Sequence, residues 1–243
     1  MITLIYGSFF YIATLFLVCG VGFKIRQYAM TPAPLKIAVT PAPTTQSGVC
    51  LRIFREVVFF ESLFKSNKWI WLFGYVFHAS LLLIILRHFR YFTEPVWPII
   101  AIIQPFGLYA GFACIIGLGG LWIRRFTVER VRYISSPSDH LMLALLAAIV
   151  LSGLFMRFVE HTDIVALKAF ILGLMYFDWQ PMPADPILMI HLGLVIVLMI
   201  IFPMSKLLHA PGVFFSPTRN QIDNPREVRH LADWAAEFDK GMR

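Results

Sequence analysis

Long apolar stretches recur along the chain and alternate with polar connections. A helix needs about 20 predominantly apolar residues to cross the hydrocarbon core of a bilayer, where it must satisfy its own backbone hydrogen bonds. Five stretches approach or exceed this length, and they are residues 2–23, 69–89, 96–123, 140–159 and 187–208. The pattern therefore predicts an all-α fold, a bundle of five transmembrane helices.

A sixth apolar stretch, residues 164–177, is shorter and is interrupted by Lys168. We expect it to lie along the membrane interface or to pack against the bundle. Residues 31–47 are rich in Pro, Thr and Ala, which predicts an extended linker between the first two spans. We assign residues 1–210 to the membrane domain and residues 211–243 to a C-terminal tail.

Residues 50–64 follow the linker and repeat apolar side chains at helical spacing, with charged residues at other positions. The apolar positions are Ile53, Val57, Phe60 and Phe64. This spacing predicts a short amphipathic helix on the cytoplasmic surface, where it would serve as an anchor.

The composition agrees with a membrane location, because 58% of the residues are hydrophobic, 14% are charged and the mean hydropathy is +0.73. The net charge is +7, but most Lys and Arg residues lie beside apolar spans rather than on one basic face, so we expect no nucleic-acid partner. These cations gather after the first span, after the third span and in the tail. Because cytoplasmic loops retain Lys and Arg, we place the N-terminus outside and the C-terminus in the cytoplasm, in a multi-pass protein of the cell inner membrane.

The three cysteines, Cys19, Cys50 and Cys114, lie far apart and form no CxxC or CxxCH motif. Covalently attached c-type haem, an iron–sulfur cluster held by this chain and a disulfide framework are therefore not expected. Residues 1–20 have no positive n-region and no small-residue cleavage site, so we expect them to remain as a membrane span.

Two predicted spans carry two histidines each, and ionisable side chains are costly inside a bilayer and usually have a functional reason to be there. The second span contains His78 and His88, and the fifth contains His191 near its start and His209 at its end. The second span runs outward and the fifth inward, so His78 and His209 share the cytoplasmic side while His88 and His191 share the outer side. Electron-transfer cytochromes b hold each haem iron between two axial imidazoles. These four histidines, which we call the quartet, therefore predict two haem b groups. The alternative for any single intramembrane histidine is a hydrogen bond between helices without a metal.

The two histidine spacings differ in length. Ten helical residues between His78 and His88 cover about 15 Å, whereas eighteen between His191 and His209 cover about 27 Å, a mismatch of about 12 Å. Pro203 can kink the fifth span and so reduce the mismatch.

Two arginines, Arg87 and Arg90, flank His88 at the outer end of the second span. A haem propionate or a quinone carbonyl would bind such cations, so we count both as candidate cofactor-binding residues. The alternative is that both are snorkelling residues at a helix end.

Five spans, the outside N-terminus and histidine spacings of ten and eighteen together resemble the gamma subunit of respiratory nitrate reductase, a dihaem cytochrome b. The resemblance implies that His78 and His209 ligate the haem nearer the cytoplasm. It implies that His88 and His191 ligate the haem nearer the outside, beside which quinol would be oxidised.

Within that family, the stretches FHASLLLIILRHFRYF and FFSPTRNQIDNPREVRHLADW are similar to DsrM, the membrane cytochrome of the DsrMKJOP complex that accompanies dissimilatory sulfite reductase. This resemblance implies a role in sulfur metabolism, with DsrK, an iron–sulfur protein similar to heterodisulfide reductase, as the cytoplasmic partner. Other membrane and periplasmic subunits would complete the complex. The chain would then be an electron-transfer subunit of a quinone-interacting oxidoreductase.

Three alternatives stay open at this point. The chain could be a nitrate reductase gamma subunit proper, a haem-free membrane anchor, or a small transporter or channel subunit whose histidines carry protons. The sequence does not predict the direction of electron flow or the type of quinone.

Overall fold

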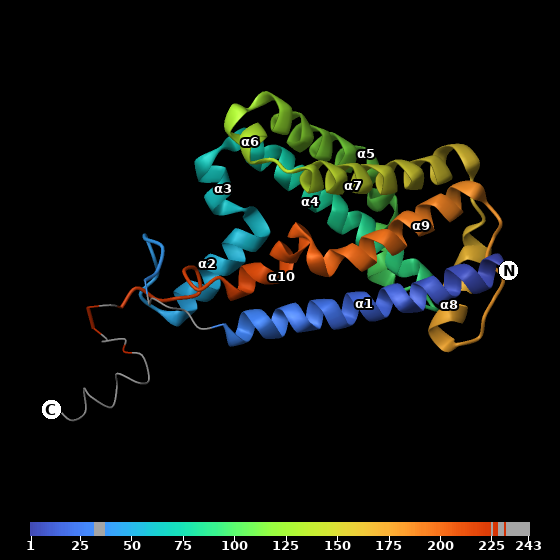
Figure 1. The fold of residues 1–243 in the computed structure, drawn as a ribbon, viewed down its shortest axis with the longest axis horizontal. Helices are drawn as coiled ribbons and strands as arrows, with labels where there is room; N and C mark the ends of the chain where they lie inside the picture. Colours follow the sequence, from blue (N-terminus) through green and yellow to red (C-terminus); the bar gives the residue numbers. More distant parts are fainter. Residues whose placement is uncertain (32–36, 225, 228–230, 232–243) are drawn as a thin grey trace. The chain divides into compact units, whose positions relative to one another are not determined.

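The structure is a computed structural model that describes residues 1–31, 37–224, 226–227 and 231 (Figure 1). Within these residues the fold is helical without strands, and five helices are long and apolar enough to cross a membrane. Two of them are single α-helices, α1 (Ile2–Met30) and α5 (Pro98–Thr127). The other three consist of α4 (Lys68–His88), α7 (Pro137–Phe155) and α9 (Pro186–Ile201), each with the helical turn that follows it, and they end at Tyr91, Glu160 and Met204. The predicted all-α class and the five spans are confirmed.

The chain forms two compact units. The bundle unit comprises Met1–Gly20 and Ser62–Ser205, and the second unit comprises Val21–Glu61 and Lys206–Arg243. This division reflects compactness rather than membrane crossing, so the membrane domain 1–210 with a separate tail stays a prediction.

Short polar or proline-containing sequences begin the helices of the bundle unit. Asn67 caps α4, because its side-chain oxygen accepts hydrogen bonds from the amides of Trp69 and Ile70, both at 3.1 Å. Ser136 and Asp139 form a capping box at the start of α7. These caps satisfy amides that have no partner within the helix, and they fix where α4 and α7 begin.

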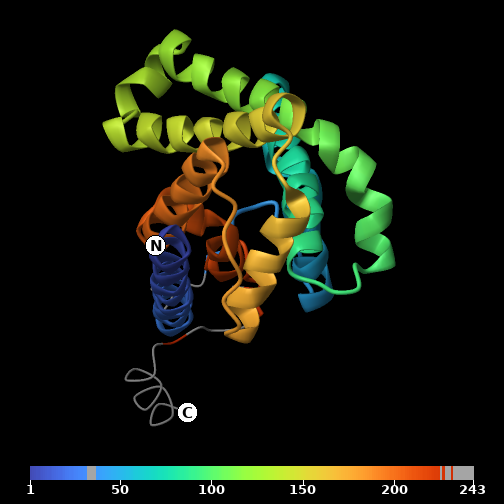
Figure 2. The same ribbon diagram turned by 90° about the vertical axis from the view of Figure 1, so that its right-hand side faces the viewer.

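Close packing of α4 on α5 forms one core of the bundle unit. In this core, α5 contacts both α4 and α7, and α7 also contacts α9 (Figure 1, Figure 2). Phe77, Cys114 and Leu118 are buried at the centre. Gly117 lets the two helices approach, because a Cβ atom there would lie 2.7 Å from the amide nitrogen of Phe77 and 2.9 Å from the carbonyl oxygen of Phe73.

A second core lies around α8 (Ile164–Tyr176), which has 13 residues. Its side chains Leu167, Phe170 and Leu174 are buried together with Leu188 and Leu192 of α9. The start of α1 covers this cluster, and its tyrosine hydroxyls donate hydrogen bonds to the carbonyls of Met189 and Leu174, at 2.9 and 2.6 Å. The expected packing of residues 164–177 against the bundle is confirmed.

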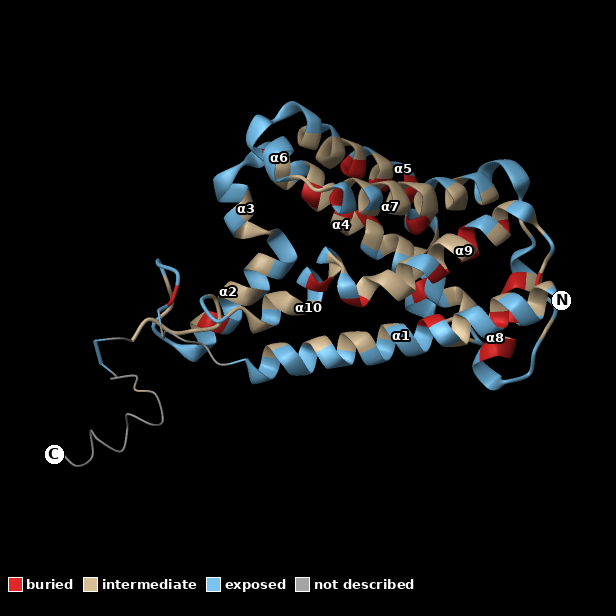
Figure 3. Cartoon of the chain, viewed as in Figure 1, coloured by how far each residue is buried: buried red, intermediate tan, exposed pale blue. Residues whose placement is uncertain are grey.

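Much of the long helices is exposed, as the pale blue stretches of Figure 3 show, and many of the exposed residues are large and apolar. Examples are Leu15, Phe16, Ile102, Phe106 and Ile116. A water-soluble protein rarely exposes so large an apolar surface, whereas lipid tails make favourable contact with it.

The fifth span is shorter than predicted. The helix α9 ends at Ile201, where the sequence predicted continuation to residue 208. Pro203 lacks an amide hydrogen and its ring clashes with the carbonyl four residues earlier, so the chain continues as two 3₁₀ turns, Phe202–Met204 and Lys206–Leu208. The span predicted over 187–208 is therefore α-helical only to Ile201, and the interruption occurs at Pro203, where the sequence indicated a kink.

The amphipathic segment is also interrupted. The helix α2 (Gln46–Phe59) is capped by Thr45 at its start and by Phe60 after its end, and the φ of Phe60, 51°, lies in the left-handed region. Helical structure resumes in α3 (Glu61–Ser66), so the single helix predicted over 50–64 is wrong. A left-handed bulky residue is unfavourable, and the sequence pattern gives no sign of it.

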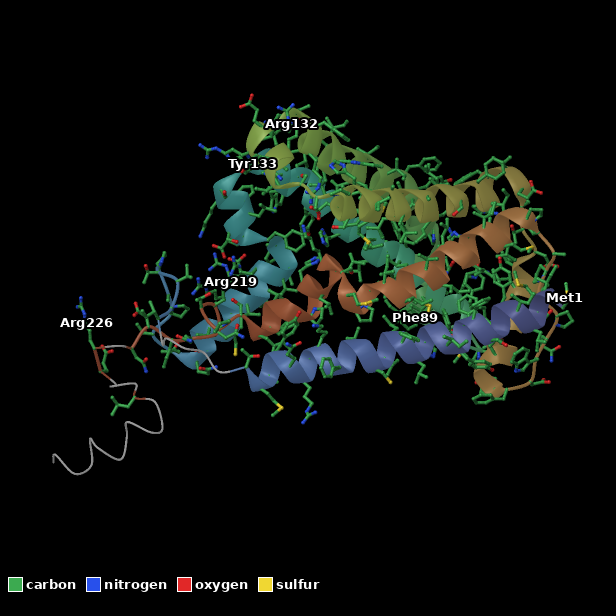
Figure 4. The ribbon with its side chains drawn as sticks, viewed as in Figure 1. Met1, Phe89, Arg132, Tyr133, Arg219 and Arg226 are labelled. Atoms are coloured by element: carbon green, nitrogen blue, oxygen red, sulfur yellow. The ribbon has the colours of Figure 1, made fainter. Side chains whose placement is uncertain are left out.

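In the second unit, the described part of the tail packs against the linker. Val39 donates a backbone hydrogen bond to Thr218 at 3.0 Å, and Asp223 donates one to Pro43 at 2.9 Å. Residues 32–36 of the predicted linker lie outside the described residues. The guanidinium of Arg219, labelled in Figure 4, also pairs with a carboxylate oxygen of α2, that of Glu56, at 3.2 Å.

Replacing Gly117 by Ala tests the close contact of α4 and α5. We expect Gly117→Ala to lower the stability of the protein by about 1–3 kcal/mol, because the added methyl group meets backbone atoms that cannot move aside easily. Thermal denaturation in detergent measures the effect. The matched control is Gly119→Ala, since a Cβ there meets nothing within 4 Å. Equal stability of the two variants would contradict the packing account.

Candidate metal centre

Two histidines from different helices lie close together in the bundle unit. His88 is the last residue of α4, and His191 lies in the second turn of α9. Their ring centres are 6.5 Å apart and their planes are within 11° of parallel. The side chain of His191 is buried, whereas His88 keeps accessible surface. The structure therefore brings together two of the four predicted ligands.

This geometry fits one iron held between two axial imidazoles. A metal–imidazole bond is about 2 Å long and each ring centre lies about 1 Å beyond its nitrogen, so two such rings stand roughly 6 Å apart across one metal ion. In a haem the porphyrin supplies the equatorial nitrogens, and two protein ligands are enough. Within the described part of the chain, no group of three or more His, Cys, Asp or Glu side chains gathers to hold a bare ion. The pair suits a haem better than a metal ion bound by protein alone.

Backbone hydrogen bonds define the tautomer of three predicted ligands. A carbonyl oxygen only accepts hydrogen bonds, so a neutral imidazole beside it carries its hydrogen on Nδ1 and its lone pair on Nε2. Each of these Nδ1 atoms lies near a carbonyl of its own turn: His78 near Gly74 at 2.7 Å, His88 near Ile84 at 2.6 Å and His209 near Lys206 at 2.8 Å. In all three rings Nε2 is the nitrogen suited to bind iron.

His191 differs, because its Nδ1 lies 2.9 Å from the hydroxyl oxygen of Ser152 on α7. The neighbouring Gly153 lets the ring approach, since a Cβ atom there would lie 3.4 Å from Cε1 of His191. A third helix thus takes part in orienting this imidazole.

His140 shows the opposite arrangement. The indole nitrogen of Trp122 donates to Nδ1 of His140 at 3.1 Å, so Nδ1 is the acceptor and a neutral ring carries its hydrogen on Nε2. This ring is engaged in a structural contact between α5 and α7, and it makes a useful contrast with the quartet.

The other predicted pair is divided between the two units. His78 is partly buried in α4 of the bundle unit, whereas His209 begins α10 (His209–Gly212) in the second unit. The units are described separately, so this pairing stays a prediction. The mismatch of about 12 Å no longer applies, because it assumed a straight helix through Pro203.

Arginines gather next to His88. Arg90 donates to the side-chain oxygen of Gln104 at 3.2 Å, and the Gln104 amide donates to the carbonyl of Arg87 at 3.3 Å. Arg157 lies close enough to Arg87 for their charges to interact. In the described part of the chain none of the three arginines forms an ion pair with a carboxylate. Three positive charges thus lie close together at this end of α4.

Sequence reasoning did not single out Ser152, Gly153, Gln104 or Arg157 as site residues. A serine and a glutamine inside apolar spans were visible signals, because polar side chains in a bilayer need partners. Their partners, however, depend on which helix faces which. Arg157 sits in the π-helical turn Met156–Glu160 that follows α7, and the pattern did not predict this turn.

Comparison with known proteins places this geometry in a family. A family model described as nitrate reductase gamma subunit matches residues 60–229, which contain all four histidines of the quartet. The chain belongs to the nitrate reductase gamma subunit family. With five apolar helices of spanning length, this family member is a multi-pass integral membrane protein.

Two archaeal relatives of this chain carry the name "Hdr-like menaquinol oxidoreductase cytochrome b-like subunit". The relative from Archaeoglobus fulgidus is 35% identical over 280 aligned residues, covering 96% of this chain and 84% of the relative. The relative from Archaeoglobus profundus is 32% identical over 274 aligned residues, covering 92% and 80%. The predicted family is confirmed, and the printed names agree with the DsrM-like subgroup.

Asp185 fixes the start of α9 and so helps to position His191. Its carboxylate accepts from the amides of Ile187 and Leu188 at 2.8 and 3.2 Å, and from the hydroxyl of Thr162. Burial favours a higher pKa for this carboxyl, but the hydrogen bonds from Thr162, Leu188 and Ile187 outweigh it and leave the pKa below its ordinary value.

We expect Asp185→Ala to lower stability by about 0.5–2 kcal/mol at neutral pH, the usual cost of losing a helix N-cap. Because the folded-state pKa lies below the ordinary value of 3.8, the advantage of wild type is present above that pH and disappears as the pH falls through the folded-state pKa. Thermal denaturation over a pH series measures this. Asp185→Asn, which still caps, should lose less stability at neutral pH. If the difference in stability between wild type and Asp185→Ala does not shrink on acidification, Asp185 does not act as an ionised N-cap.

Proposed function

We propose that this chain is a dihaem cytochrome b subunit that carries electrons between a membrane quinone and a cytoplasmic iron–sulfur partner. One observation carries the proposal: the rings of His88 and His191, from two different spans, have centres 6.5 Å apart and nearly parallel planes. The family match and the names of the archaeal relatives support it.

In this proposal His88 and His191 hold the haem b nearer the outside, and His78 and His209 hold the haem b nearer the cytoplasm. Haem supplies reversible one-electron chemistry at iron, while the chain positions the ligands and excludes water. His78 precedes His88 by ten residues on one helix, which separates the two ligands by about 15 Å. The two sites would then lie one above the other across the membrane.

The proposed orientation has the N-terminus outside and the C-terminus in the cytoplasm. Under this orientation Arg87, Arg90 and Arg157 lie at the outer end, where a cluster of cations needs a local cause. Haem propionates and a quinone carbonyl are acceptors that arginine binds well. We therefore propose that Arg87 and Arg90 bind the outer cofactor, with Gln104 holding Arg90 in place.

We propose that quinol reacts beside His88, with menaquinol as the substrate that the relatives' names suggest. The cytoplasmic partner would be a DsrK-like iron–sulfur subunit, within a DsrMKJOP-type complex of sulfur metabolism that has further membrane and periplasmic subunits. Its docking site would include the inner loops, from which the exposed Arg132 and Tyr133 project on α6 (Glu129–Ile134; Figure 4).

A nitrate-reducing partner is the second candidate, because the family description names nitrate reductase. The relatives' names favour an Hdr-like complex instead. Subunits that co-purify with the tagged chain from native membranes distinguish the two. A partner that reduces nitrate in the purified complex would favour the nitrate reductase, and an iron–sulfur partner without that activity would favour the Hdr-like complex.

Replacing each histidine of the quartet tests the proposal directly. We expect the purified wild-type complex to contain two haem b per chain, and His78→Ala, His88→Ala, His191→Ala and His209→Ala to contain one each. A pyridine haemochrome assay against protein concentration counts them, and reduced-minus-oxidised spectra show which haem remains.

The matched control is His161→Asn, which replaces an exposed histidine outside the quartet by a residue that tolerates its positive φ of 58°. It should retain both haems. The haem-free anchor would be favoured if wild type contained none, and the ligand assignment would be wrong if His191→Ala retained both.

A further inference from the structure

Each of the four Nδ1 contacts of the quartet described above has a carbonyl as its partner, except that of His191, whose partner is the hydroxyl of Ser152. It belongs to α7, whereas the other three partners are carbonyls of the histidine's own turn. Its oxygen also lies 2.8 Å from the carbonyl of Ala148 and 3.0 Å from that of Ile149.

The single hydroxyl hydrogen decides the direction of the contact with His191. Both carbonyls only accept, so the Ser152 hydrogen goes to one of them. The oxygen is then the acceptor toward His191, and Nδ1 of His191 is the donor. This chain of two hydrogen bonds runs from His191 through Ser152 to the backbone of α7, and it assigns the lone pair of His191 to Nε2.

We propose that Ser152 is a positioning residue for His191 that sets the reduction potential of the outer haem. This inference rests on the proposed function, because it requires His191 to be an axial ligand. Hydrogen bonds from the distal nitrogen of a ligating imidazole orient the ring and raise its basicity. A more basic ligand stabilises ferric iron, so the hydrogen bond to Ser152 lowers the potential of the haem that His191 holds.

The hydroxyl is well suited to this role. By donating to a carbonyl, the Ser152 oxygen becomes a better acceptor, because successive hydrogen bonds polarise one another. Gly153 brings the backbone of α7 close to the same ring, so ring and hydroxyl are held together by packing as well as by the hydrogen bond. The three carbonyl contacts come from residues three or four positions before the histidine, whereas this contact links the ligand to another span.

The test is a spectroelectrochemical titration of the purified complex, together with a haem count. Ser152→Ala removes the hydroxyl acceptor of His191 and leaves the nearby carbonyl of Ile149 as the remaining backbone acceptor. We expect two haems, with the potential of one shifted upward and the other unchanged. Ser152→Thr keeps a hydroxyl that can bond to the carbonyl four residues earlier, and it should restore the wild-type potential.

The matched control is Ser80→Ala. Ser80 lies in α4 and is buried, and its hydroxyl oxygen lies 2.6 Å from the carbonyl of Val76 and 2.9 Å from that of Phe77, the same two positions in the turn that Ser152 contacts in α7. It has no hydrogen bond to a histidine in the described part of the chain, so both potentials should stay at the wild-type values.

Wild-type potentials in a Ser152→Ala complex with two haems would overturn the role of Ser152 and leave the ligand assignment standing. An equal shift of the haem potential in Ser80→Ala would also overturn it, because the shift would then follow from the loss of any serine that bonds to its own helix. A wild-type complex without haem would instead overturn the proposed function itself. Loss of one haem from Ser152→Ala, with both haems kept by Ser152→Thr and Ser80→Ala, would support Ser152 as the residue that positions His191.

Discussion

An imidazole inside an apolar bundle has two polar nitrogens, and each must find a partner or incur a desolvation cost. The chain meets this requirement for Nδ1 of His78, His88 and His191 with two carbonyls and one hydroxyl. This leaves Nε2 with the lone pair in every case. In hydrocarbon such a lone pair needs a hydrogen-bond donor or a metal ion as its partner. The ring centres of His88 and His191 are separated by a distance that suits one iron, so a single iron could be the partner of both rings.

The surrounding packing keeps those rings in place. α4 lies so close to α5 that Gly117 has no room for a side chain, and α9 starts at a well-capped residue, Asp185, one and a half turns before His191. Gly153 brings α7 against the His191 ring. Ligands held on packed helices lose little conformational freedom when they bind a cofactor, which favours both tight binding and a defined iron environment.

The sequence predicted the features that depend on local composition. The five spans, the packed sixth helix and the family follow from long apolar runs and from histidine spacing, and all were confirmed. Pro203 indicated an interruption of the fifth span, but not that α9 would end at Ile201. The break at Phe60 was missed, because the spacing of apolar residues carries no sign of a left-handed residue. Ser152 and Arg157 were missed as site residues because their role depends on which faces of α4, α7 and α9 meet, and a single sequence pattern does not specify rotation about a helix axis.

The most direct test of the account is an experimental structure of the purified, haem-loaded complex by electron cryomicroscopy. The account predicts a flat macrocycle between α4 and α9, with Nε2 of His88 and Nε2 of His191 each about 2 Å from one iron on opposite faces. The Nδ1 atom of His191 should then face the hydroxyl of Ser152. A macrocycle bound elsewhere, or direct contact of the two imidazoles with no iron between them, would contradict it.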